Sequence, residues 1–150
     1  MKNKGFSMVE LIIVIAIMAI LAGALAPALI KYINKSRIST DISNGQQIAS
    51  AIQTAMSNEQ AYDELTTDYS GVDFATIHGL GTNFKKEIQS VIGQSVPKRK
   101  AKKDAKGSPQ TDMNFYVTVK AASNEVSVFA GSKNDTDLLV YPSVGAKWTD

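Results

Sequence analysis

The sequence of 150 residues has no cysteine, a single histidine and a single tryptophan. Without cysteine the chain can form no disulfide, thiolate metal site or haem attachment, so its folded part must be held together by packing alone. The histidine, His78, lies beside Gly79 and outside any cluster of acidic residues, so no catalytic or metal-binding role is expected for it. No nucleophile–base set, phosphate-binding loop or metal cluster is recognisable either, and the sequence predicts no enzyme, no metal and no cofactor.

Net charge is also nearly absent outside the first few residues. The whole chain has 16 basic and 14 acidic residues, and Lys2 and Lys4 account for the difference. The rest of the chain is formally neutral, which gives no general reason to expect nucleic acid as a partner.

Charged residues are missing from residues 11–30, an apolar run of 20 residues. Because a helix rises by about 1.5 Å per residue, this run matches the roughly 30 Å hydrocarbon thickness of a bilayer. Lys2 and Lys4 precede the run and favour a single span with the N-terminus in the cytoplasm and the bulk of the chain outside, although basic residues also follow the run at positions 31, 35 and 37.

An ordinary cleaved signal peptide accounts less well for this N-terminus than an uncleaved apolar run does. Ala24-Leu25-Ala26 has the small residues of a cleavage site, but Pro27 would follow the cut and hinder an extended substrate. Glu10 also lies where the basic head meets the apolar run, where an acid is costly and indicates a functional site. Two simpler interpretations stay open: an uncleaved signal anchor, and a Glu10 side chain that only reaches the lipid headgroups.

Residues Gly5-Phe6-Ser7-Met8-Val9-Glu10, followed by about twenty apolar residues, resemble the processing motif of type IV pilins and pseudopilins. In that family a membrane aspartic protease, the prepilin peptidase, cuts after the glycine and methylates the new N-terminus. The resemblance therefore implies a leader peptide of residues 1–5, charged by the two lysines already noted. It also implies cleavage after Gly5 and N-methylation of Phe6.

Cleavage would leave a free α-amine on Phe6, which is largely cationic at neutral pH because its reference pKa is near 8. Glu10 follows four residues later and could pair with that amine within one helix, but the family's usual assignment pairs the glutamate with the amine of a neighbouring subunit. Phe6 and Glu10 are therefore the candidate assembly residues of a helical homopolymer. The resemblance further implies as partners the prepilin peptidase, a pilus assembly platform with its ATPase, and the membrane.

The helical pattern continues beyond the apolar run. Apolar or small residues recur at intervals of three and four, at Ile38, Ile42, Gly45, Ala49, Ile52 and Met56. The sequence predicts one helix from about Phe6 to about Asn58, with a transmembrane or filament-core half (6–30) and an amphipathic half (31–58). Gly23 and Pro27 weaken the first half and predict a kink or a short unwound stretch. The alternative is that both are ordinary residues of a membrane helix.

The remaining residues predict a small head. Residues 59–112 form a variable αβ-loop region with a helix at 84–92, capped by Asn83 or Thr82 and closed by Gly93, and a weaker helix at 72–77. Residues 113–150 contain three β-like runs and a tail in which Trp148 is a packing anchor; the runs are 113–121, 125–130 and 138–141. The predicted fold class is α+β, a long N-terminal helix packed against a small antiparallel β-meander, which the pilin resemblance also implies.

A basic loop is predicted at 97–109, bounded by prolines. Its cations are Lys98, Arg99, Lys100, Lys102, Lys103 and Lys106. A solvated loop that keeps a filament soluble is the favoured interpretation, because no aromatic residues are interleaved to stack on bases. The alternative is a patch that binds DNA or anionic surface polymers.

Together these features predict a structural subunit of a type IV pilus, which lies in the cytoplasmic membrane before assembly and in a surface filament afterwards. The filament would serve adhesion, twitching motility or DNA uptake. The alternative is a pseudopilin of a type II secretion or competence system, although the tail lacks the acidic, glycine-rich calcium loop associated with major secretion pseudopilins. A membrane-anchored extracytoplasmic enzyme or binding protein is the remaining alternative.

Overall fold

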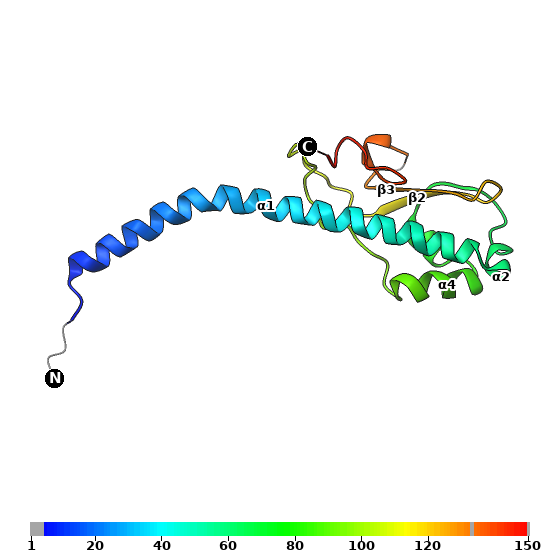
Figure 1. The fold of residues 1–150 in the computed structure, drawn as a ribbon, viewed down its shortest axis with the longest axis horizontal. Coiled ribbons are helices and arrows are strands. Elements are labelled where there is room, and N and C mark those ends of the chain that lie inside the picture. The colour runs from blue at the N-terminus through cyan, green and yellow to red at the C-terminus, as the bar shows by residue number, and fades with distance from the viewer. Residues whose placement is uncertain (1–4, 133, 150) are drawn as a thin grey trace. The chain divides into compact units, whose positions relative to one another are not determined.

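The computed structural model describes residues 5–132 and 134–149. The chain divides into two compact units, Met1–Ile33 and Asn34–Asp150, and helix α1 (Met8–Met56) contributes residues to both (Figure 1). The prediction of one long N-terminal helix is thereby confirmed. Each unit is built differently.

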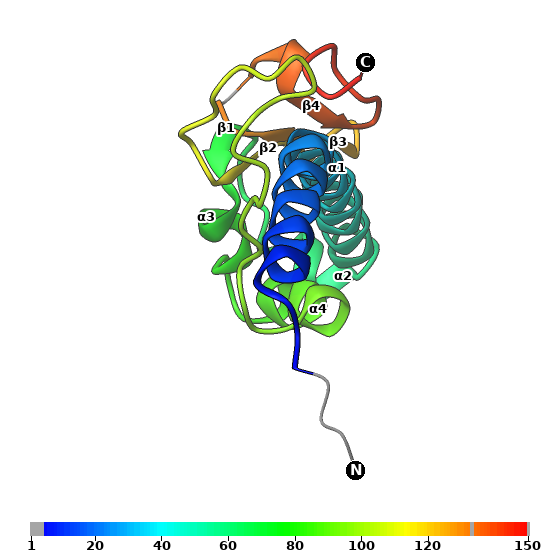
Figure 2. The same cartoon turned by 90° about the vertical axis from the view of Figure 1, so that its left-hand side faces the viewer.

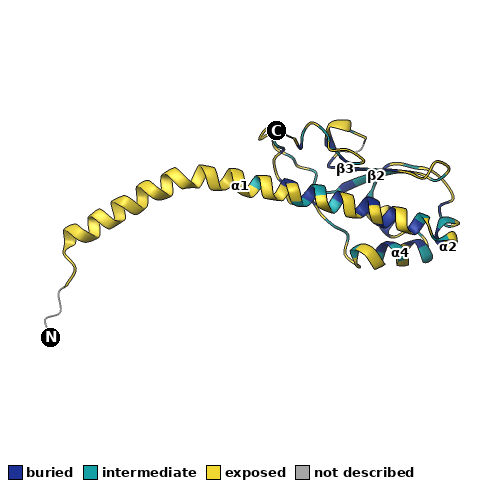
Figure 3. Ribbon diagram, viewed as in Figure 1, coloured by how far each residue is buried: buried dark blue, intermediate teal, exposed yellow. Residues whose placement is uncertain are grey.

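In the first unit every described side chain is exposed, from Gly5 to Ile33 (Figure 3). The helix is continuous through Gly23 and Pro27, so residues 8–33 contain no unwound stretch and that part of the prediction is wrong. A proline removes a single N–H donor, and the neighbouring turns keep their own hydrogen bonds.

The second unit packs the rest of α1 with three short helices and one sheet. In chain order its elements are α2 (Glu59–Tyr62), β1 (Tyr69–Asp73), α3 (Phe74–His78), α4 (Asn83–Ile92), β2 (Phe115–Lys120), β3 (Glu125–Ala130), the 3-10 helix η1 (Thr136–Leu138) and β4 (Leu139–Tyr141). The strands pair in the order β1-β2-β3-β4, all antiparallel. This arrangement confirms the predicted α+β class and the meander of the last three strands.

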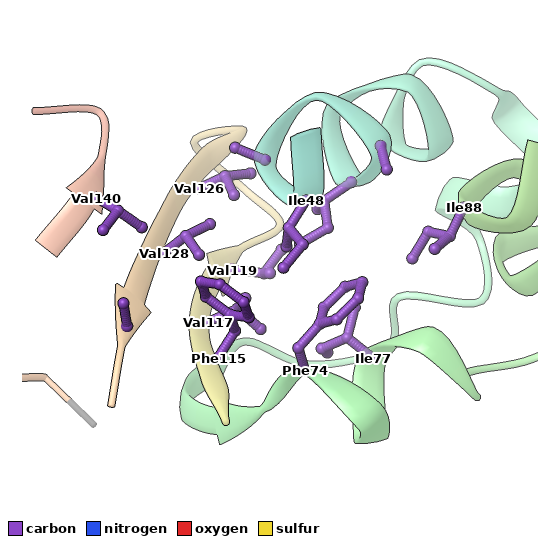
Figure 4. Packing of buried hydrophobic residues seen from close by; sticks show 14 of the residues in the cluster. Ile48, Phe74, Ile77, Ile88, Phe115, Val117, Val119, Val126, Val128 and Val140 are labelled. Atoms are coloured by element: carbon purple, nitrogen blue, oxygen red, sulfur yellow. The ribbon is translucent and has the colours of Figure 1, made fainter. Parts of the chain in front are cut away.

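The core lies between one face of α1 and the sheet. Figures 1 and 2 show this part of α1 between the sheet and α4. Side chains from β2, β3, α3 and α4 converge on Ile48, which is fully buried (Figure 4). Full burial of an isoleucine or phenylalanine contributes roughly 1.5–3 kcal/mol. The helix positions predicted from periodicity include four buried residues, Ile38, Gly45, Ala49 and Ile52.

Strand β1 was not predicted. The sequence indicated a helix at 72–77, whereas the structure has a strand up to Asp73 and helix α3 from Phe74. Gly71 adopts a φ of +57°, and the register of β1 against β2 shifts between Tyr69 and Val72. A bulge of this kind breaks the alternation of side chains from which strands are recognised.

Helix α4 confirms the predicted helix at 84–92 and its closure by Gly93, and the N-cap is one of the two predicted residues. Thr82 occupies the N-cap position without a side-chain hydrogen bond to the helix. The carboxylate of Glu64 accepts instead from the backbone N–H groups of Asn83 at 3.0 Å and Phe84 at 2.8 Å. These hydrogen bonds hold the pKa of Glu64 below its usual value. A distant acid thus satisfies the exposed N–H groups that begin the helix.

Candidate functional site

The N-terminus of α1 is held by a reciprocal pair of hydrogen bonds between Ser7 and Glu10. The Ser7 backbone N–H donates to Glu10 Oε2 at 2.8 Å. In return, Ser7 Oγ accepts from the backbone N–H of Val9 at 3.2 Å and of Glu10 at 3.5 Å. This is a capping box, S-x-x-E, which satisfies N–H groups that have no partner inside the helix. The spacing of Ser7 and Glu10 is visible in the sequence, but the acid was interpreted as an assembly residue beside a membrane span, and its capping role was missed.

The capping box places the predicted cleavage bond outside the helix. Gly5, Phe6 and Ser7 precede the first helical residue, Met8. The Phe6 side chain is 87% exposed. Proteases cleave accessible, non-helical segments most readily. Lys2 and Lys4, the predicted leader charges, lie outside the described residues.

Glu10 has a partner on its own chain before any cleavage. The expectation that an acid at this position is costly therefore needs revision, because the Ser7 N–H satisfies one of its oxygens. A carboxylate has two oxygens, so a second donor can bind at Oε1.

The exposed surface of α1 that follows is almost entirely apolar. It includes Leu11, Ile13, Ile17, Leu21, Leu25 and Leu29, each more than half exposed. Among the described helices, α1 is long and apolar enough to cross a membrane. An additional Cβ at Gly23 would meet no atom within 4 Å, so this glycine is not required by any contact that the described chain makes with itself.

Arg99, a predicted member of the basic patch, turns inward. Its side chain is buried, with Nε 3.8 Å from Oδ2 of Asp41 and its guanidinium carbon 4.8 Å from the ring centroid of Trp148. Asp41, on α1, also accepts from the backbone N–H of Lys100 at 2.7 Å and of Ala101 at 2.9 Å. Arg99 is therefore no part of a surface patch, and Trp148 is confirmed as a packing anchor.

Burial and charge oppose each other in this cluster. Burial raises the pKa of Asp41 and outweighs the hydrogen bonds from Ala101 and Lys100 and the charge of Arg99, which lower it. Burial likewise lowers the pKa of Arg99, against the raising effect of Asp41. Stacking on Trp148 gives the guanidinium a further partner. Together the three side chains tie the basic loop and the C-terminal tail to α1.

The other five cations of the basic loop remain exposed: Lys98, Lys100, Lys102, Lys103 and Lys106. Their loop is well fixed by main-chain contacts. Asn34 Nδ2 donates to the carbonyl oxygens of Lys103 at 3.4 Å and Asp104 at 3.3 Å. The Asp104 carboxylate, which is buried, accepts from the Ser108 N–H at 2.8 Å.

His78 has the structural surroundings of a packed side chain. Its Nε2 lies 3.3 Å from the Gly93 carbonyl oxygen, and its ring meets the edge of Phe74 at 5.9 Å between centroids. Within residues 5–132 and 134–149 no three metal-ligating side chains gather in one place.

Comparison with known proteins finds a motif at the N-terminus and similarity of the chain to fimbrial proteins. Residues 1–26 match the family model described as the prokaryotic N-terminal methylation motif. The chain is 39% identical over 62 residues to the type IV major fimbrial protein FimA of Dichelobacter nodosus, a match that covers 41% of this chain and 39% of that protein. It is 36% identical over 75 residues to a fimbrial protein of Moraxella nonliquefaciens, which is 49% of either chain. The chain thus spans less than half the length of the curated relatives it matches. No solved structure matches it significantly.

Proposed function

We propose that the chain is a structural subunit of the type IV pilin kind that polymerises into a surface filament, because residues 1–26 match the N-terminal methylation motif and the chain is similar to type IV fimbrial proteins. The observation that carries the proposal is the exposed apolar surface of α1 up to Ile33. Soluble monomers rarely expose contiguous apolar patches larger than a few hundred Å². This half of the helix therefore needs either lipid or other copies of itself, and a filament core of packed helices supplies the second.

Processing precedes assembly in this proposal. The prepilin peptidase cuts after Gly5 and methylates Phe6. The capping box supports this step because it makes the helix begin at Met8, so that Phe6 and Ser7 separate the cleaved bond from the helix. Methylation keeps the positive charge of the new amine.

Assembly then uses Glu10 and the mature amine of Phe6. In the uncleaved chain Glu10 Oε2 accepts from Ser7. After cleavage the cationic amine of a neighbouring subunit binds the same carboxylate, which compensates its charge in an apolar core and fixes the axial position of one subunit against the next. Pro27 and Gly23 lie in the same core segment, where they allow local bending.

The proposed location changes with assembly. The leader lysines Lys2 and Lys4 hold the N-terminus in the cytoplasm while α1 spans the membrane and the head lies outside. An assembly platform driven by its ATPase then extracts the subunit into the filament, which serves adhesion, twitching motility or DNA uptake. No enzymatic role is assigned, since the lone histidine is occupied by packing contacts.

Mass spectrometry of fibres sheared from cells tests the proposal. We expect the chain in the sheared fraction, lacking residues 1–5 and carrying one methyl group on the amine of Phe6. Blocking the peptidase provides the matched control, in which the full-length chain stays in the membrane fraction. An intact Met1 in the membrane of untreated cells, with none in fibres, would contradict the proposal.

A pseudopilin of a secretion or competence system is the second candidate, because the motif match is confined to residues 1–26 and does not extend to the head. The two functions differ in fibre length and in cargo. Deletion of the gene should remove long surface fibres if the chain is a pilin, and should stop protein export while leaving such fibres in place if it is a secretion pseudopilin.

A further inference from the structure

Five exposed lysines on one loop have no part in the filament core described above. We call residues 98–106 the lysine loop; its exposed cations are Lys98, Lys100, Lys102, Lys103 and Lys106. Among the residues that the structure describes, none of these five ammonium groups forms an ion pair. Asp104, the one acid in residues 98–106, and Arg99 are both buried.

The loop presents these cations in a fixed conformation. The backbone N–H of Gln110 donates to the Lys102 carbonyl oxygen at 2.8 Å, and that of Asp104 to the Ser108 carbonyl oxygen at 2.9 Å. Asp41 binds two further N–H groups of the same segment, those of Lys100 and Ala101. A charged surface held in this way loses little conformational entropy when it meets a partner.

The loop is attached to the start of the head. Asn34 Nδ2 donates to the carbonyl oxygens of Lys103 and Asp104. Asn34 follows Ile30, the last residue of the charge-free run, by four residues. Four residues span about 6 Å in a helix and at most about 14 Å in any conformation, whatever the orientation of the two units. The headgroup layer of a bilayer leaflet is roughly 5–8 Å thick.

We propose that the lysine loop binds the anionic phospholipid headgroups of the membrane in which the subunit is anchored. The inference rests on the membrane anchoring of the proposed function. Clusters of basic residues close to a membrane span attract anionic lipids, and their effect falls off within one Debye length of the surface. The short chain between Ile30 and Asn34 keeps the Lys103–Asp104 end of the loop, which Asn34 binds, within that range. DNA carries the same phosphodiester charge but is less suited, since no exposed aromatic side chains interleave with these lysines.

Lipid binding gives the loop a role before assembly. The headgroups would hold the head against the membrane surface while the subunit is in the bilayer, and extraction into a filament would break these contacts. Each lysine close to an anionic surface increases the equilibrium constant for binding that surface by roughly fivefold. The five lysines together can therefore bind the headgroups far more tightly than any one of them.

A nitroxide label on the full chain in lipid nanodiscs tests the inference. The chain has no cysteine, so Ser108→Cys gives one unique labelling position beside the lysine loop. The Ser108 main-chain bonds to Asp104 do not involve its side chain and are kept. Ser123→Cys, exposed in the β2–β3 turn, is the control position. Collision of each label with a nickel chelate attached to the lipid headgroups is measured in phosphatidylcholine discs with and without phosphatidylglycerol.

We expect phosphatidylglycerol to increase the collision rate at position 108 and not at position 123, and 1 M salt to remove the increase. The double substitution Lys102→Gln/Lys103→Gln should weaken the response by roughly 25-fold in binding constant. Lys85→Gln/Lys86→Gln, two exposed lysines of α4, removes the same charge elsewhere and should leave the response unchanged.

An equal collision rate in neutral and anionic discs would overturn the inference, as would an equal response of the two double variants. If the label at position 108 responds to an added DNA duplex and not to phosphatidylglycerol, the ligand of the lysine loop is DNA and the lipid proposal is wrong. All variants change exposed side chains, so each head should fold. The fluorescence of Trp148, which is buried in the folded head, verifies this. The nanodisc result is independent of the fibre result. A chain that is found in sheared fibres but shows no increase in collision rate in anionic discs overturns the lipid proposal and leaves the filament proposal intact.

Discussion

From residue 5 to residue 33 all side chains are exposed, whereas from Ile38 to Ala55 the same helix buries eight residues against its own head. Both halves of the helix contain many isoleucines and alanines and one glycine each, so residue type alone does not explain the difference. The head half has polar residues on the opposite face, while the first half is apolar all round. A helix with an apolar stripe finds its partner within the chain, and a helix that is apolar on every face needs partners on every side.

Removal of the Glu10 charge should have the largest effect on the first half. Glu10→Gln keeps the acceptor for the Ser7 N–H, because a capping box tolerates glutamine, but has no charge to pair with a neighbour's amine. We expect normal cleavage and a loss of sheared fibre by about two orders of magnitude, since breaking a buried ion pair costs roughly 3–5 kcal/mol. The exposed acid Glu59, changed to Gln, is the control for assembly. Normal fibres from Glu10→Gln would refute the pairing.

Arg99→Ala should have the largest effect on the head. It leaves Asp41 buried without its cationic partner, which costs roughly 3–5 kcal/mol of unfolding free energy. Denaturant unfolding of the full chain in detergent, followed by the fluorescence of Trp148, measures this cost. Lys98→Ala, an exposed cation of the same loop, should change it little. Equal unfolding midpoints for the two variants would show that the buried cluster does not stabilise the head.

Two glycines of α1 provide a direct comparison of the halves. A Cβ at Gly45 would lie 2.3 Å from Val140 Cγ2, whereas a Cβ at Gly23 meets no atom within 4 Å. Gly45→Ala should therefore destabilise the head by about 1–3 kcal/mol through overpacking. Gly23→Ala should leave head unfolding unchanged and favour the helix by up to about 1 kcal/mol. Denaturant unfolding of the head, followed by the fluorescence of Trp148, tests both variants. An equal change in unfolding free energy for Gly45→Ala and Gly23→Ala would show that the two halves of α1 do not differ in their packing against the head.

The pH dependence of Glu64 should be the smallest effect. Its pKa is lowered in the folded head by hydrogen bonds from Asn83 and Phe84, so its contribution is present above the ordinary pKa of 4.5 and is lost as the pH falls through the lower folded value. Thermal unfolding of the unchanged protein should therefore lose this contribution on acidification, and Glu64→Gln should not show that loss. Glu59→Gln serves as the control; a pH profile for Glu64→Gln identical to that of the unchanged protein would contradict the capping role.

The sequence predicted features that depend on residues close together in the chain. Alternation in β2 and β3 and the helical spacing from Ile38 to Met56 are local patterns, and the processing motif is a continuous segment. These patterns were sufficient for the fold class and for the N-terminal methylation motif.

Features that depend on residues far apart were not predicted. Arg99 lies in a run of lysines that it resembles, and its partner Asp41 is 58 residues away in the chain. One available indication was overlooked: arginine is less strongly hydrated than lysine and is the usual choice for a buried ion pair. Glu64 likewise caps a helix that begins at Asn83, a distance over which capping rules do not apply.

The cluster of Asp41, Arg99 and Trp148 has a consequence for where and when the subunit can be made. A head closed by a disulfide requires an oxidant and an oxidising compartment before its tail is secure. This head requires neither, since its tail is secured by stacking and charge on a chain without cysteine. Folding of the head therefore needs no thiol oxidation, and reducing agents should leave the stability of the head unaffected.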